Sequence, residues 1–334
     1  PRRWLVSAAE DGTVKAWDWS AYAGWKLLAP DAVWTAAGQT GITDVAWSPD
    51  GASVVSAAQS GVPVLWNSAT GTIRARLAGH PDKVAAAGAA FTDDGSQVVT
   101  VDDGGGIRRW RTDDGSAAGS PVAAGFAATG RPVLSANAAT LVGVVSDAKT
   151  GICDLRAWDT RTGGLLAHLP RLPGHISALS LSHDGRSAAA QMGGRGIDIL
   201  TFRPTGTAAT LAESDSFDML DALRFDPAGR TVRGLSVDGR MCVWAADGRL
   251  VARTPLPCRG RFAVSPDGRR GAFWVGQTRP NDWVEIRDPA TGALQAVLSD
   301  VGGGVGDAAF SPDGRRLLVG GADGRLRVFV FPDP

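Results

Sequence analysis

The stretch from Val305 to Phe331, VGDAAFSPDGRRLLVGGADGRLRVFVF, decides the fold. It opens with an apolar run, and Ser311-Pro312-Asp313-Gly314 then predicts a tight turn, because proline presets φ and glycine tolerates positive φ. A second apolar run, a second turn at 322–324 and a third run complete three short strands. Such an antiparallel meander cannot bury both of its faces alone, so it needs neighbours of the same kind.

The same pattern recurs along the chain. A large residue closes the third strand of each copy, at spacings of 42 to 49 residues: Trp17, Trp66, Trp110, Trp158, Leu200, Trp244, Ile286 and Phe329. The first turn recurs at 48–51, 92–95, 182–185, 226–229 and 265–268. A period of about 40–45 residues with four strands per unit is that of a propeller blade.

Two short motifs add to this period. Trp17-Asp18 and Trp158-Asp159 match the dipeptide that names the WD-repeat (WD40) β-propeller family, and Gly79-His80 and Gly174-His175 match its Gly-His pair. The chain resembles this family over nearly its whole length. The resemblance implies an all-β propeller of four-stranded antiparallel blades. It implies no particular function, because propellers host many.

The number of blades depends on the N-terminal segment. Residues 2–19 read as the second and third strands of a unit without its first strand, and Ala32–Gly38 reads as an outer fourth strand. We predict a single propeller whose seven blades span 31–334, closed by the strand around Trp34. Residues 1–30 are then the end of a preceding repeat or propeller plus a linker. The alternative is an eighth blade that contains 2–19.

Composition indicates which kinds of partner the protein binds and in which cellular compartment it lies. The formal net charge is zero, from 34 basic and 34 acidic residues, which argues against a general nucleic-acid or anionic-membrane surface. Three cysteines without paired spacing predict a reducing, cytoplasmic location. No apolar run is long enough for a transmembrane helix. The few lysines among many arginines, with abundant Ala and Gly, suggest a bacterial, actinobacterial-like source. The chain begins on Pro1, so we expect its natural N-terminus to lie upstream.

The family resemblance also implies a structural tetrad of His, Ser or Thr, Asp and Trp within a blade. One unit offers all four, as His80, Thr100, Asp103 (or Asp102) and Trp110. A His near an Asp and a Thr also fits acyl-transfer chemistry, but the resemblance places this group between strands, so we predict a structural role. Gln39 replaces the His before the strand that begins at Ile42, and we expect blades without a full tetrad to be held mostly by apolar packing.

No motif predicts a cofactor or a metal. The four histidines show no metal-ligand spacing, and the cysteines form no C-x-x-C pair. No nucleophile elbow or phosphate loop is present. We therefore predict no catalytic residue, no cofactor and no metal. A propeller enzyme, hydrolase-like, with an acidic site in the central channel is the alternative, and Asp44, Asp221 and Asp307 on the inner strands are its candidates. We expect them to be solvated.

The remaining hypothesis is a scaffold or sensor module that binds a protein or peptide, monomeric as a domain and part of a larger bacterial chain. The loops on the face where outer strands return to inner ones carry large and arginine side chains of the kind that dominate interfaces. The candidate partner-binding residues are Phe217, Met219, Arg259, Arg261, Arg279 and Trp283, with Arg195 as a weaker one. A second candidate is the cluster Trp19, Tyr22 and Trp25 on the other side. Zero net charge predicts weakly salt-dependent binding.

Overall fold

The computed structural model describes residues 4–8, 14–18, 26–59, 62–80, 86–124, 132–146, 153–172, 176–192, 197–202, 208–213, 219–226, 229–256, 258, 260–274 and 283–332. Their regular structure is strand throughout, β1 to β31. In this part of the chain, no helix is long and apolar enough to cross a membrane.

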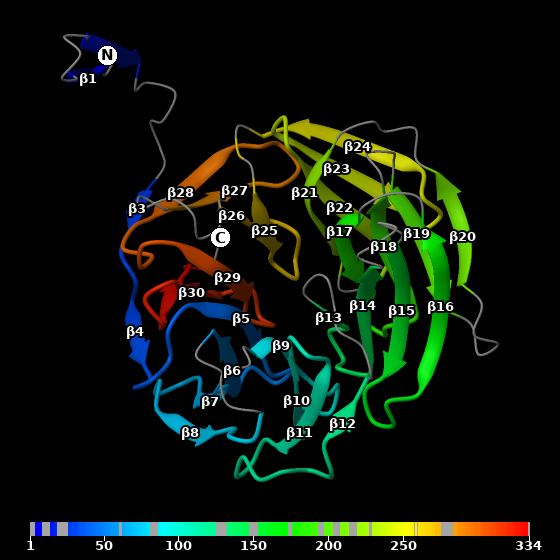
Figure 1. Cartoon of the computed structure of the whole chain (residues 1–334). Helices are drawn as coiled ribbons and strands as arrows, with labels where there is room; N and C mark the ends of the chain where they lie inside the picture. Colours follow the sequence, from blue (N-terminus) through cyan, green and yellow to red (C-terminus); the bar gives the residue numbers. More distant parts are fainter. Residues whose placement is uncertain are drawn as a thin grey trace.

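Seven sheets stand around a central axis, as Figure 1 shows, and form a seven-bladed propeller. Each blade is an antiparallel meander, as the short runs and tight turns predict. Six blades take consecutive strands. The bounds along the chain are β5 (Ile42–Trp47), β6 (Ser53–Ala58), β7 (Val64–Asn67), β8 (Ile73–Arg76); β9 (Ala86–Phe91), β10 (Gln97–Asp102), β11 (Gly106–Arg111), β12 (Val122–Ala123); β13 (Val133–Leu134), β14 (Thr140–Ser146), β15 (Cys153–Asp159), β16 (Leu165–Leu172); β17 (Ile176–Leu181), β18 (Ser187–Met192), β19 (Ile197–Phe202), β20 (Ala208–Glu213); β21 (Leu220–Phe225), β22 (Thr231–Ser236), β23 (Arg240–Ala245), β24 (Leu250–Pro255); and β25 (Arg261–Val264), β26 (Gly271–Trp274), β27 (Val284–Arg287), β28 (Leu294–Leu298).

The seventh blade joins the two ends of the chain. Its first three strands are β29 (Val305–Phe310), β30 (Arg316–Gly321) and β31 (Arg325–Val330), and its outer strand is β4 (Ala32–Thr35). β4 pairs antiparallel with β31 in a register that places Trp34 opposite Leu326. The prediction of a ring closed by the strand around Trp34 is confirmed, and the eight-bladed alternative is wrong.

Strands β1 (Trp4–Ala8) and β2 (Val14–Asp18) pair only with each other among the described strands. Figure 1 shows β1 outside the ring. The strands expected at 2–19 therefore exist, but they form a separate two-stranded sheet and no blade of this propeller.

A further strand, β3 (Lys26–Leu28), is not predicted by the sequence. It pairs parallel with β28 and makes the β25–β28 blade five-stranded. The backbone N–H and the hydroxyl of Ser299 both donate to the carbonyl of Leu28, at 2.9 and 3.1 Å. Leu28 packs against the core between this blade and the next. The segment 26–35 thus joins the outer edges of two consecutive blades.

The core lies between consecutive blades. Trp34 and Trp66, from the seventh blade and the β5–β8 blade, stack with ring centroids 5.9 Å apart. They belong to one buried cluster with Val45, Leu318 and Val328. Each apolar face left open by one meander is therefore covered by the next, and the ring closure completes the last of these contacts.

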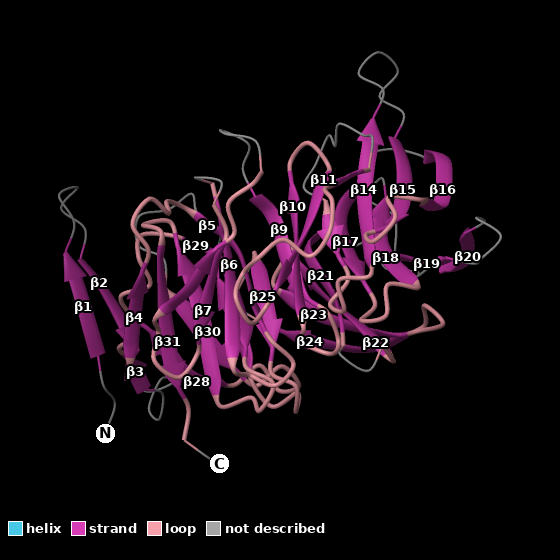
Figure 2. Ribbon diagram, turned by 90° about the horizontal axis from the view of Figure 1, so that it is seen from below, coloured by secondary structure: helices cyan, strands magenta, loops and turns pink. Residues whose placement is uncertain are grey.

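The antiparallel order gives the ring two faces, which Figure 2 shows edge-on. We call the face that carries the turns between first and second strands, and between third and fourth strands, the lower face. The opposite face carries the turns between second and third strands and the connections from one blade to the next, and we call it the upper face.

The same kind of hydrogen bond holds the first turn in six of the seven blades. The Ser48 hydroxyl donates to Asp50 at 2.5 Å, and Asp50 also accepts from the backbone N–H of Ala52 at 2.9 Å. Gly51 takes a φ of 69°. The same hydroxyl-to-side-chain bond recurs at five further turns, as Thr92–Asp94, Ser135–Asn137, Ser182–Asp184, Ser265–Asp267 and Ser311–Asp313. The turn at Ser135 is absent from the predicted set, because Asn137 and Ala138 stand where the other copies have Asp and Gly.

Candidate functional site

The predicted tetrad residues of the β9–β12 blade meet in one buried network. The His80 ring bonds through Nε2 to the Thr100 hydroxyl at 2.7 Å, and the Trp110 indole Nε1 donates to the same hydroxyl at 2.8 Å. His80 Nδ1 lies 3.0 Å from Oδ2 of Asp102. The carboxylate also accepts from the backbone N–H of Gly106 at 2.7 Å. The network therefore connects polar groups of β10, β11 and the segment that carries His80.

The carboxylate of the tetrad belongs to Asp102, and the choice of Asp103 is wrong. Alternate residues of a strand share a face, so Thr100 and Asp102 point together into the blade, while Asp103 is exposed. Burial lowers the pKa of His80 below its ordinary value, and the hydrogen bond to Asp102 opposes that effect. The network is closed to solvent, because the side chain of His80 is only 1% exposed. Its role is therefore to hold the blade together.

In the β5–β8 blade, Gln39 takes the place of the histidine. Its Oε1 accepts from the Ser56 hydroxyl at 3.2 Å, and Trp66 Nε1 donates to the same hydroxyl at 2.9 Å. Gln39 Nε2 donates to the carbonyl of Val62 at 3.1 Å. A neutral amide thus replaces the imidazole in this blade, and the polar network persists beside the apolar cluster around Trp66.

The acids of the inner strands connect neighbouring blades. Asp307 accepts from the backbone N–H of Val45 at 3.2 Å, and Asp44 accepts from that of Ala89 at 2.8 Å. Asp221 accepts from Gly260 at 2.8 Å. Asp307 is 8% exposed, so the expectation that these acids are solvated is wrong for it. The hydrogen bonds give all three carboxylates a role in holding one inner strand to the next.

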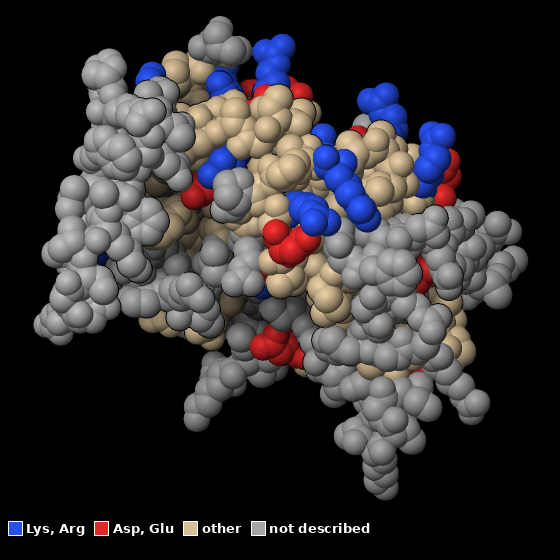
Figure 3. Space-filling model, turned by 90° about the horizontal axis from the view of Figure 1, so that it is seen from above, with Lys and Arg blue, Asp and Glu red and all other residues tan. Residues whose placement is uncertain are grey.

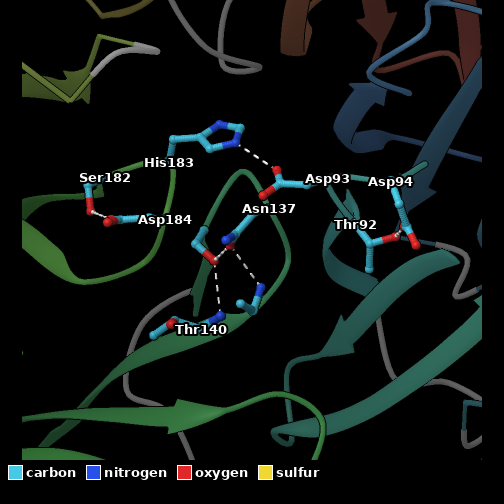
Figure 4. Close-up of polar contacts among 10 residues, drawn as sticks. Thr92, Asp93, Asp94, Asn137, Thr140, Ser182, His183 and Asp184 are labelled. Atoms are coloured by element: carbon cyan, nitrogen blue, oxygen red, sulfur yellow. Dashed lines mark hydrogen bonds and ion pairs between the residues drawn. The ribbon is translucent and has the colours of Figure 1, made fainter. Parts of the chain in front are cut away.

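A polar cluster joins three turns on the lower face, shown in Figure 4. His183 Nε2 lies 2.7 Å from Oδ1 of Asp93, although the two residues belong to blades that flank the β13–β16 blade. The backbone N–H of Asn137, from the turn of that middle blade, donates to the carbonyl of His183 at 3.2 Å. The two blades on either side of the β13–β16 blade are therefore bonded directly to each other, next to the turn that follows the short strand β13.

The candidate partner residues fall on the upper face where the structure describes them. Met219 precedes β21 and is 51% exposed, and Trp283 precedes β27 and is 55% exposed. Arg261 is half-buried, and its Nη1 donates to the carbonyl of Gly306 in the next blade at 2.8 Å. Arg261 therefore links two neighbouring blades of the ring. Phe217, Arg259, Arg279 and Arg195 lie outside the described residues, as does the cluster of Trp19, Tyr22 and Trp25.

The structure adds Val237 to the exposed apolar residues of this face. Val237 lies in the turn between β22 and β23 and is 37% exposed, and its backbone N–H donates to the carbonyl of Met219 at 2.8 Å. The sequence does not indicate that Val237 is exposed, because a single valine before Asp238-Gly239 looks like the end of a strand. Its pairing with Met219 shows that the two side chains start from adjacent backbone.

Charge does not separate by sign on the surface that Figure 3 shows. Lys and Arg side chains project along one edge of that view, with Asp and Glu among them.

Among the described residues, no three His, Cys, Asp or Glu side chains converge on a point that could hold a metal ion.

One family model matches the chain. This model, described as WD domain, G-beta repeat, matches residues 2–18, 31–67 and 293–329. The second and third segments each begin at an outer strand, β4 or β28, and run through the first three strands of the following blade. The comparison with curated proteins found no match.

Proposed function

We propose that this chain, whose WD40 repeats form part of a seven-bladed propeller, is a non-catalytic module that binds a protein or peptide partner on its upper face. WD40 domains are commonly scaffolds for protein interaction. The observation that carries the proposal is the exposure of Trp283 and Met219 on the upper face of consecutive blades.

The physical argument concerns what these side chains do when no partner is bound. Large apolar side chains left in water cost free energy that a partner can recover, and interface energy concentrates in such anchors. Val237 extends the apolar surface next to Met219. Arg261, which bonds to Gly306, acts less as an anchor than as support for the inner strands beneath. We define the upper apolar patch as Met219, Val237 and Trp283.

A photo-crosslinking experiment tests this face directly. The photoreactive amino acid p-benzoylphenylalanine replaces Trp283 in one variant and Leu165 in another, and both are irradiated in cells of the source organism. Leu165, on the outer strand β16, is a matched control because it is also 55% exposed. We expect a discrete crosslinked protein from position 283 and none from position 165.

Affinity measurements with the crosslinked partner complete the test. Trp283→Ala and Met219→Ala should each weaken binding, with Trp283→Ala costing about 2 kcal/mol or more if it is a hot spot. Leu165→Ala should leave the affinity unchanged. Because the patch is apolar, added salt should weaken binding only slightly. Equal crosslinking from both positions, or binding that survives both upper-face changes, would reject the proposal.

We also propose that the module acts in the cytoplasm of a bacterium as one part of a longer chain. Cys153, Cys242 and Cys258 form no disulfide in the described part of the chain, which fits a reducing compartment.

A further inference from the structure

A cleft of about 620 Å³ opens on the lower face, between the β5–β8 blade and the β9–β12 blade. One side carries Arg74, at the start of β8, and the turn around Asp50. The other side carries Ser96 and Gln97 and the loop 111–119. This volume lies within the range of ligand-binding sites. The cleft is on the face opposite the upper apolar patch, so it is a separate feature of the molecule.

The loop that forms the second side of the cleft is held in place by close contact. A Cβ on Gly115, which has a φ of +72°, would lie 2.1 Å from the Cβ of Ala75, so the loop backbone packs directly on β8. The loop is closed by backbone hydrogen bonds from Arg111 to Ser116 at 2.8 Å and from Gly115 to Arg111 at 3.0 Å. The backbone of Arg111 is therefore held by hydrogen bonds within the loop, and such preorganisation lowers the cost of binding a ligand.

The charged groups of the cleft differ in how far they are already engaged. Asp50 accepts two hydrogen bonds, which hold its pKa below the ordinary value, and Asp113 accepts one from the backbone of Asp114 at 2.9 Å. Within the described part of the chain, the guanidinium groups of Arg74 and Arg111 have neither a hydrogen bond nor an ion pair as close as 4.0 Å. The cleft thus presents two cations whose donors are available, beside carboxylates that are partly satisfied by their own turns.

We propose that this cleft binds an acidic peptide segment of a protein partner, with an Asp or Glu carboxylate of that segment held by Arg74 and Arg111. Guanidinium groups bind carboxylates through two parallel hydrogen bonds, which adds geometric specificity to charge. Gln97 accepts from Arg109 Nε at 2.9 Å, which fixes its amide at the edge of the cleft beside the incoming chain. The site is independent of the upper apolar patch.

The test measures fluorescence anisotropy of a short fluorescein-labelled peptide of alternating glutamate and glycine, with the corresponding lysine peptide and free glutamate for comparison. We expect the intact protein to bind the glutamate peptide and not the lysine peptide. Added salt should weaken binding, since the contacts are between exposed charges. Free glutamate at the same concentration should not displace the peptide. Displacement by it would mean a small-acid site and would overturn the assignment to a peptide.

Variants locate the binding. The double change Arg74→Ala and Arg111→Ala should reduce affinity by about tenfold or more, which corresponds to about 1.4 kcal/mol. The matched control is Arg76→Ala with Arg249→Ala, which removes the same charge from two exposed arginines outside the cleft. The control should retain its affinity, and both proteins should melt as the parent does.

Two further variants test whether binding depends on the hydrogen bonds of the arginines and whether it is independent of the upper apolar patch. Replacing Arg74 and Arg111 by Lys keeps the charge but loses the paired donors, so we expect an affinity between those of the parent and the Ala variant. Trp283→Ala should leave peptide binding intact, so this result does not depend on the upper-face proposal. Absence of peptide binding, or equal losses in the Arg74/Arg111 and Arg76/Arg249 variants, would overturn the inference.

Discussion

The hydroxyl of Thr100 shows how one residue can organise the inside of a blade. It interacts with both His80 and Trp110, at 2.7 and 2.8 Å, and it is fully buried. Removing one member of a buried network leaves its partners without hydrogen bonds, and that penalty exceeds the net value of the bond itself. The role of this network is therefore to fix one arrangement of β10, β11 and the segment that carries His80.

We expect Thr100→Val to lower the free energy of unfolding by about 1–3 kcal/mol, because it keeps the shape and removes the shared hydroxyl. His80→Ala should cost a similar amount. Asp103→Ala is the control, and it should have almost no effect because its side chain is exposed and outside the network. Urea unfolding followed by tryptophan fluorescence measures all three. If Asp103→Ala cost as much as Thr100→Val, the assignment of the carboxylate to Asp102 would be incorrect.

Protonation of His80 makes stability depend on pH. Its pKa in the folded protein lies below the ordinary value of 6.5, so the unfolded chain binds the proton more readily. The stability that the neutral ring contributes is then fully present above the ordinary pKa and is lost as pH falls toward the folded pKa. We expect the stability difference between the parent and His80→Gln to shrink between about pH 7.5 and about pH 5.5. A difference that stays constant over this interval would contradict it.

At the scale of strands and turns, the contact between Gly71 and Trp34 limits how the closing strand fits. Gly71 lies in the turn before β8, with a φ of +69°, and a Cβ there would lie 2.2 Å from Nε1 of Trp34. Trp34 belongs to the closing strand β4 and stacks on Trp66. The turn before β8 therefore needs a glycine at position 71, because a side chain there would collide with Trp34 of the closing strand β4.

Gly71→Ala should therefore destabilise the protein more than Gly51→Ala does. Gly51 has the same φ of +69°, but its nearest neighbour to an added Cβ is Pro312, at 3.7 Å. Backbone strain alone predicts a cost of about 1–2 kcal/mol for Gly51→Ala. Gly71→Ala adds a steric conflict, for which overpacking costs of about 1–3 kcal/mol are typical. Equal melting temperatures for the two variants would show that Trp34 moves aside freely.

The sequence predicts the strands well where turn chemistry is regular. The inner strands β5, β17, β21, β25 and β29 each end directly before a turn that the sequence predicts. β13 is shorter than these strands, and the turn after it lacks the Asp and Gly that mark the others. Ala138 adopts a φ of 58° there without being glycine. β3 could not be predicted from a three-residue segment whose pairing partner, β28, is remote in sequence. The choice of Asp102 over Asp103 depends on which residue of β10 shares a face with Thr100, and an uncertain strand end leaves that open.

At the scale of the whole molecule, the ring depends on β4 and not on the segment before it. Deleting residues 1–20 removes β1 and β2, which form their own sheet. We expect that protein to melt cooperatively at nearly the parent temperature. Deleting residues 1–36 also removes β3 and β4, exposes the edge of β31 and uncovers Trp66, so we expect an early, broad transition and aggregation. Circular dichroism and light scattering during heating measure both. A strong loss in the shorter deletion would mean that β1 and β2 support the ring.

The pairing of β4 with β31 has a consequence for how the protein is made. The backbone N–H of Val330 donates to the carboxylate of Asp31 at 2.6 Å, so residues 299 positions apart meet at the closure. On the ribosome, β4 emerges early and has no partner until β31 has been synthesised. For most of translation the nascent chain carries an unpaired strand with an exposed tryptophan, a state in which such edges invite association with other chains. Molecular chaperones that bind short apolar strands should therefore engage this nascent polypeptide at 32–35 and release it only near the end of translation.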